Sequence, residues 1–100
     1  MKHVKINSDL GIETFYVEHT DTYGGEANYC WVHRFKVSAR TMREALTKVK
    51  REIWYAPVPR TKVSNYGDML RADCVKSPEC FFVYYFDADS HGSYSNIKEL

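Results

Sequence analysis

One segment of this chain has helical periodicity, and the segments around it have the pattern of strands. Its apolar residues recur at the spacing of one helix face: Met42, Ala45, Leu46, Val49 and Ile53. Thr41 and Glu44 have the spacing of a capping box, so we expect the helix to begin at Thr41, with Ser38 as a competing cap three residues earlier. Pro57 and Pro59 cannot continue it. A single helix can cover only one face of a sheet, so the second face must be either solvated or used for binding.

Four strands are expected, two before the helix and two after it. Residues 12–19 and 28–37 have the alternation of half-buried strands, and the Gly-Gly pair at 24–25 between them is typical of a hairpin tip. Residues 69–75 also alternate, whereas residues 80–86 are apolar on both faces, as in a central strand. The face of 28–37 expected to point inward contains Tyr29, Trp31, His33, Phe35 and Val37.

The fold class that this pattern predicts is α+β. We expect an antiparallel sheet of about four strands, in the order strand, strand, helix, strand, strand, with one amphipathic helix packed on one face. Residues 1–100 are expected to form a single domain, with residues 1–10 as a flexible or edge arm, 56–68 as a loop and 88–100 as a mobile polar tail. The uncovered aromatic face could be buried in a homodimer or under the arm.

Composition narrows the class of partner and the compartment. Fourteen Lys and Arg against thirteen Asp and Glu give a net charge of +1, which excludes a strongly basic nucleic-acid binder and an acidic mimic of nucleic acid. Three cysteines are an odd number, and no signal peptide precedes them, so we expect a reduced, cytoplasmic protein of a bacterial host cell. The longest apolar run, 80–86, is too short to span a membrane.

The sequence contains no recognisable catalytic motif, so we expect a protein that is not an enzyme and that binds no metal and no cofactor. Cys30 and His33 lie three residues apart on a strand and therefore on opposite faces, where they cannot share a hydrogen bond. The cysteines and His33 also lack the paired spacing of a metal site. One enzymatic or ligand-sequestering alternative is a pocket between the hairpin tip and the long loop, formed by Asp21, His33, Asp68 and Cys74.

Two surfaces are candidates for binding a partner. The first combines acids and tyrosines of the hairpin tip and the long loop, because acids bind Lys and Arg by charge-assisted hydrogen bonds and tyrosine is enriched at interfaces: Asp21, Tyr23, Glu26, Tyr66 and Asp68. The second is a basic patch on the helix, suited to an anionic partner: Arg40, Arg43, Lys48, Lys50 and Arg51. We interpret the first as a protein-binding surface and the second as the basis of a nucleic-acid-binding alternative.

Residues 20–32, TDTYGGEANYCWV, together with the Tyr-Gly-Asp-Met segment at 66–69, resemble small proteins encoded in phages, prophages and other mobile elements. The similarity covers roughly residues 14–87. The N-terminal arm, the prolines at 57 and 59 and the Ser-rich tail depart from the pattern.

The resemblance implies a biological setting, that of a phage or mobile element, and transfers no catalytic or ligand-binding residues. Small phage proteins of this build act by binding a host macromolecule, and the anti-CRISPR proteins are one such class. We therefore expect a non-enzymatic inhibitor that sterically blocks a bacterial defence complex, such as a CRISPR effector ribonucleoprotein. The alternative is a small nucleic-acid-binding regulator that uses the basic helix face, whose affinity would fall steeply with salt.

Overall fold

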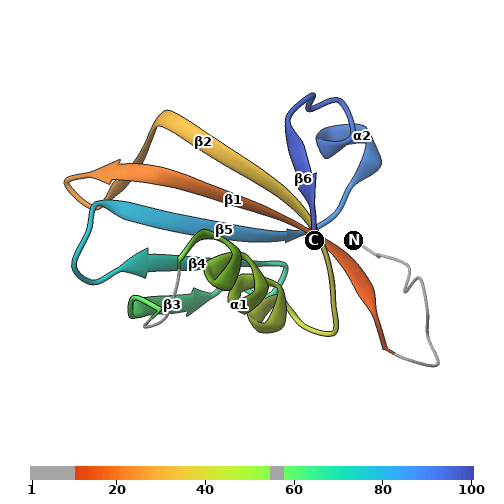
Figure 1. Cartoon of the computed structure of the whole chain (residues 1–100), viewed down its shortest axis with the longest axis horizontal. Coiled ribbons are helices and arrows are strands. Elements are labelled where there is room, and N and C mark those ends of the chain that lie inside the picture. The colour runs from red at the N-terminus through yellow and green to blue at the C-terminus, as the bar shows by residue number, and fades with distance from the viewer. Residues whose placement is uncertain (1–10, 55–57) are drawn as a thin grey trace.

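Within residues 11–54 and 58–100, which the computed structural model describes, six strands form one sheet and two helices lie against it (Figure 1). The elements are β1 (Glu13–Tyr23), β2 (Glu26–Ala39), α1 (Met42–Ile53), β3 (Thr61–Asn65), β4 (Met69–Cys74), β5 (Glu79–Tyr85), α2 (Ala88–His91) and β6 (Ile97–Glu99). The strand order is β3-β4-β5-β1-β2-β6. Neighbouring strands are antiparallel except for β2 and β6, which are parallel.

The α+β class is confirmed, but the expected number of strands was wrong. β3 forms inside the segment 56–68, expected to be a loop, and pairs with β4 in antiparallel register. Its sequence, TKVSN, is mostly polar because β3 is a sheet edge that buries little surface. The segment 88–100 was expected to be a mobile tail, yet it forms α2 and β6. The expected arm at 1–10 lies outside the described residues.

α1 begins where the capping pattern predicts. The Thr41 hydroxyl accepts a hydrogen bond from the Glu44 N–H at 3.0 Å, and the Glu44 carboxylate accepts one from the Arg40 N–H at 2.6 Å. The helix ends at Ile53, where Trp54 takes an extended backbone. Its apolar side chains pack on the sheet, and Ala45 and Val49 are fully buried. Each fully buried Val or Leu on this stripe contributes about 1.5–3 kcal/mol.

The second face of the sheet is covered from within the chain. α2 lies at one end, where the His91 ring stacks on Tyr16 with 4.0 Å between centroids. Tyr16 is 1% exposed although it faces away from α1. Nearer the hairpin tip, the ring of Tyr29 lies 6.3 Å from that of Phe82. A homodimer was one expectation because this aromatic face was predicted to lie uncovered. Side chains of the same chain cover much of it.

Candidate functional site at the hairpin end

A buried carboxylate organises the end of the β1–β2 hairpin. The register shifts between Thr20 and Thr22, where a single residue of β1, Asp21, lies opposite residues 28–31 of β2. Asp21 is 6% exposed, and its carboxylate accepts hydrogen bonds from the Cys30 N–H at 2.8 Å and the Asn28 side chain at 3.3 Å. Burial alone would raise the pKa of Asp21, but the hydrogen bonds outweigh it and hold the pKa below its ordinary value.

This bulge turns Tyr29 to the opposite side of the sheet from Trp31. Tyr29 has a φ of 56°, the left-handed region that a non-glycine residue enters at a cost of roughly 1–3 kcal/mol. The expectation that Tyr29 shares the inward face with Phe35 was wrong for this reason. Its ring stacks near Phe82, and half of its surface stays exposed.

Apolar side chains are exposed where three segments meet at this end of the sheet. The Thr22 N–H donates to the Pro78 carbonyl at 2.8 Å, and the Val75 N–H donates to the Arg60 carbonyl at 3.1 Å. These bonds hold the β4–β5 turn between the hairpin and the segment leading into β3. The large hydrophobic residues exposed on these segments are Tyr23, Tyr29, Trp31, Val58 and Val75. We call this set the hairpin-end surface, and Tyr23 is its most exposed member at 71%.

The predicted protein-binding residues do not come together. Tyr66 and Asp68 lie in the β3–β4 turn, and Met69 next to them pairs with Tyr84, which pairs with Tyr16. Tyr16 is five residues along β1 from Asp21, or about 17 Å of strand. The turn therefore lies at the other end of the strands from the hairpin tip (Figure 1).

Individual members of the predicted set also differ in accessibility. Tyr23 and Glu26 are exposed at the tip, as are Tyr66 and Asp68 in their turn, whereas Asp21 is buried and fully engaged. The alternative pocket that would join Asp21 and His33 to Asp68 does not form, because Asp68 is at the far end. Cys74 is half-buried, and the thiols of Cys30, Cys74 and Cys80 are all free.

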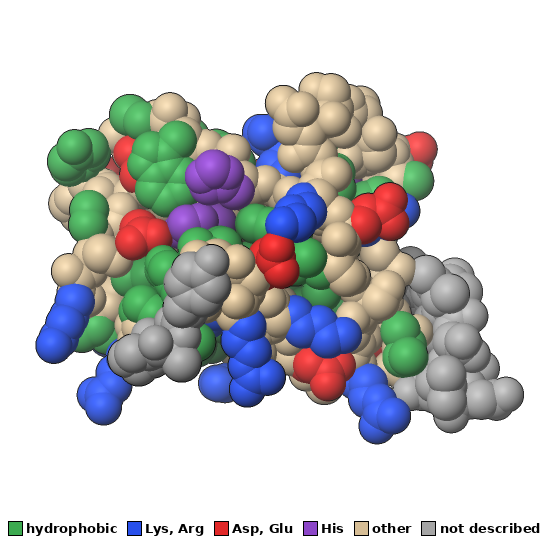
Figure 2. Space-filling view, in the orientation of Figure 1, with side chains coloured by type: hydrophobic (Ala, Val, Ile, Leu, Met, Phe, Trp, Pro, Cys, Tyr) green, Lys and Arg blue, Asp and Glu red, His purple; other side chains and the backbone are tan. Residues whose placement is uncertain are grey.

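The side chains of the predicted basic patch differ in exposure and in hydrogen bonding. Arg40, Arg43 and Arg51 are exposed. Lys48 is exposed but donates to the Ser38 carbonyl at 2.6 Å. Lys50 is half-buried and donates to the Thr61 hydroxyl at 3.0 Å, and burial lowers its pKa. Figure 2 shows Lys and Arg side chains gathered along the α1 side of the molecule.

A histidine that no motif singled out lies beneath the hairpin-end surface. His19 of β1 is 4% exposed and is packed among aromatic rings. Phe81 stacks on it at 4.5 Å, and His33 lies beside it at 5.7 Å. Trp31 and Trp54 meet it edge-on at 4.7 and 5.9 Å. We call these five residues the His19 cluster.

The carboxylate of Glu79 fixes the tautomer of His19. Its Oε1 lies 2.6 Å from the His19 Nε2, and its Oε2 accepts a hydrogen bond from the Ser77 hydroxyl at 2.7 Å. Burial lowers the pKa of His19, because desolvation of the charged ring outweighs the attraction of Glu79. A neutral His19 therefore donates its Nε2 proton to Glu79, and its Nδ1 has no partner in the described part of the chain.

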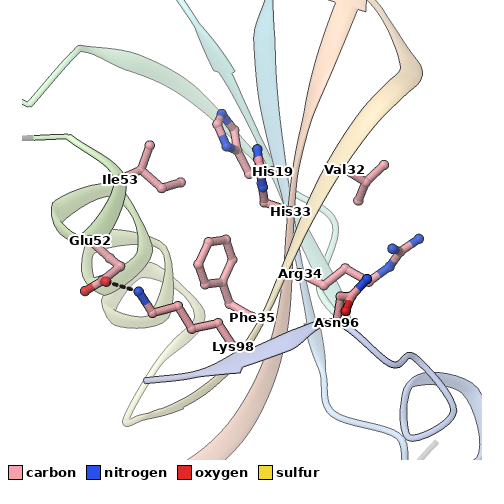
Figure 3. A pocket seen from close by; sticks show the side chains of 9 residues that line it. All are labelled: His19, Val32, His33, Arg34, Phe35, Glu52, Ile53, Asn96 and Lys98. Atoms are coloured by element: carbon pink, nitrogen blue, oxygen red, sulfur yellow. Dashed lines mark hydrogen bonds and ion pairs between the residues drawn. The ribbon is translucent and has the colours of Figure 1, made fainter.

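A hollow of about 500 Å³ opens beside the two histidines, between β2, β6 and the end of α1. Figure 3 shows the imidazoles of His19 and His33 together at one end of it and the Glu52–Lys98 ion pair at the other. Figure 2 shows histidine at the surface there, among hydrophobic and acidic side chains. Across residues 11–54 and 58–100, no group of three or more His, Cys, Asp or Glu is arranged to hold a metal ion.

The signal that could have found the His19 cluster was weak. The alternation of apolar residues places His19 and Phe81 on the inner faces of their strands. It gives no indication that the two strands are neighbours in the sheet. Glu79 is the first residue of β5, directly after the β4–β5 turn, and in sequence it looks like an ordinary surface acid.

Comparison with known proteins finds no matching family model, no matching curated protein and no matching solved structure. None of the described helices is both long and apolar enough to cross a membrane. The site must therefore be interpreted from its own chemistry.

Proposed function

We propose that this protein is a non-enzymatic binding protein that attaches to a protein partner through the hairpin-end surface. The observation that carries the proposal is the exposure of Tyr23, Trp31 and Val75 on segments that hydrogen bonds hold together. Aromatic anchors in a polar surround are the side chains that dominate binding energy at protein interfaces. The strained backbone at Tyr29 is also typical of positions kept for function.

The partner that we propose is a bacterial defence complex, such as a CRISPR effector, which this protein inhibits by steric occlusion. The resemblance of residues 20–32 to small phage proteins supports this choice, and these residues supply most of the hairpin end. Tyr66 and Asp68 are left out of the proposed contact, because the β3–β4 turn is at the opposite end of the sheet.

The test is capture of the partner from a lysate of a bacterium with an active CRISPR system, using tagged protein and a nuclease-treated control. We expect recovery of effector subunits, insensitive to nuclease. Tyr23→Ala should lower recovery at least tenfold, because it removes the most exposed aromatic side chain of the surface. Tyr66→Ala is the matched control, since Tyr66 is 61% exposed at the far end and should leave recovery unchanged. Equal loss in both variants, or recovery of no effector subunit, would contradict the proposal.

The exposed Arg40, Arg43 and Arg51 favour one second candidate, a nucleic-acid-binding regulator. It predicts binding of short DNA or RNA that weakens steeply between low and moderate salt and that Arg43→Gln reduces. Binding that is absent at low salt excludes it.

A further inference from the structure

A second hollow, of about 710 Å³, lies beside the β4–β5 turn, at the same end of the sheet as the hairpin tip (Figure 1). One wall is residues 58–60, which lead into β3, and the other is residues 75–77 with Glu79. The Val75 N–H donates to the Arg60 carbonyl at 3.1 Å and so holds the two walls together. Because the walls are fixed in this way, little ordering is needed before an occupant binds.

Apolar side chains on both walls of this hollow are open to solvent. Val75 is 58% exposed and Val58 is 36% exposed, and Pro59 lies beside them in the lining. Within the described part of the chain no aromatic side chain lines the hollow, so it is poorly suited to the stacking of a nucleobase. An aliphatic side chain of a partner would remove these apolar surfaces from water.

Two cations at this hollow have no acidic partner. Arg60 and Lys76 are both exposed, and neither forms an ion pair with any other described residue. The Glu79 carboxylate also lines the hollow, but its Oε1 accepts a hydrogen bond from the His19 Nε2 at 2.6 Å and its Oε2 one from the Ser77 hydroxyl at 2.7 Å. Two cations against one engaged carboxylate leave the described lining positive, which favours an acidic occupant.

We propose that this hollow takes an acidic segment of the partner protein. An aliphatic side chain of the segment lies between Val58 and Val75, and flanking carboxylates bind Arg60 and Lys76 by charge-assisted hydrogen bonds. Val58 and Val75 already belong to the hairpin-end surface, so the segment is part of the same contact. This inference rests on the proposed function, since it assigns the chemistry of the partner's contact.

The test uses model peptides with blocked termini in place of the partner. The first has four aspartates around a central leucine, the second has asparagines in place of the aspartates, and the third has serine in place of the leucine. Binding is followed by NMR from the methyl signals of Val58 and Val75. We expect saturable shifts of both with millimolar affinity for the first peptide. The other two should bind at least fivefold more weakly, because one lacks the charge and the other lacks the apolar side chain.

Lys76→Gln and Arg60→Gln isolate the contributions of the two cations. Both residues are exposed, and the glutamine at 60 keeps the backbone carbonyl that bonds Val75, so the fold should persist. Affinity for the aspartate peptide should fall about threefold in each, the size expected for one solvated ion pair. Lys62→Gln is the matched control, because Lys62 is exposed on β3 outside the lining and its replacement removes the same charge.

Three outcomes would overturn the acidic segment: equal binding of the aspartate and asparagine peptides, the same affinity loss in Lys62→Gln as in Lys76→Gln, or no shift at Val58 and Val75. A short single-stranded DNA that binds more tightly than the aspartate peptide, and loses affinity in Lys76→Gln, would also overturn it and would assign the cations to a nucleic acid.

The peptides are independent of any partner, so these outcomes are distinguishable from failure of the proposed function. Capture that depends on Tyr23, by a protein whose valine signals do not respond to the aspartate peptide, would reject the acidic segment and keep the binding surface.

Discussion

Asp21 stabilises the hairpin rather than offering a surface charge. The register shift leaves residues of β2 without backbone acceptors on β1. The Asp21 carboxylate replaces these acceptors, chiefly for the Cys30 N–H. The bulge in turn sets the strained backbone of Tyr29. One short acidic side chain therefore decides which face of the sheet receives Tyr29.

Replacing Asp21 by Ala is expected to loosen the bulge, because the Cys30 N–H loses its acceptor inside the protein. The amide proton of Cys30 should exchange at least tenfold faster, and the urea midpoint of unfolding should fall. Asp68→Ala is the control, since Asp68 is exposed and should change neither quantity. Unchanged exchange at Cys30 in Asp21→Ala would show that the bulge is held by other contacts.

At the scale of the element, α1 depends on its first turn. The Thr41 hydroxyl satisfies the Glu44 N–H, one of the four N–H groups that the start of a helix leaves without partners. The stripe of Ala45, Leu46 and Val49 then fixes the helix against the sheet.

Thr41→Ala should lower the free energy of unfolding by about 1 kcal/mol, the usual cost of losing an N-cap. Thr47→Ala is a matched control, because Thr47 is exposed in the middle of α1 and alanine favours the helix there. Urea unfolding of both variants measures the difference. A loss of the same size in Thr47→Ala would mean that threonine is not acting as a cap at position 41.

At the scale of the whole molecule, burial of His19 couples stability to pH. Above about pH 6.5 the ring is neutral in the folded and unfolded states. Below that value the unfolded chain binds a proton that the folded protein does not, because burial has lowered the pKa of His19 in the folded state. His91, against Tyr16, has its pKa lowered by burial and acts in the same direction.

The free energy of unfolding should therefore fall as the pH drops from 7.5 to 5, by at most about 1.4 kcal/mol per pH unit for each such proton. Urea unfolding across this range measures it, and His91→Gln should flatten the slope without removing it. Stability that is constant or rises on acidification would contradict a neutral, buried His19.

Much of this architecture follows from local pattern. The helix start at Thr41 and the strands in 12–19, 28–37, 69–75 and 80–86 are readable because capping and hydrophobic period depend only on residues close in sequence. β3 and β6 were missed, since a short edge strand with a polar composition has the same pattern as a loop.

The sequence by itself determined the secondary structure of most of the chain and, outside the bulge at Tyr29, which residues of a strand share a face. The tertiary structure alone decided that Asp21 is buried, that the β3–β4 turn lies away from the hairpin tip, and that Glu79 meets His19. Those relations depend on strand order and register between segments as far apart as 60 residues. They are fixed by packing across the sheet, which no local period encodes.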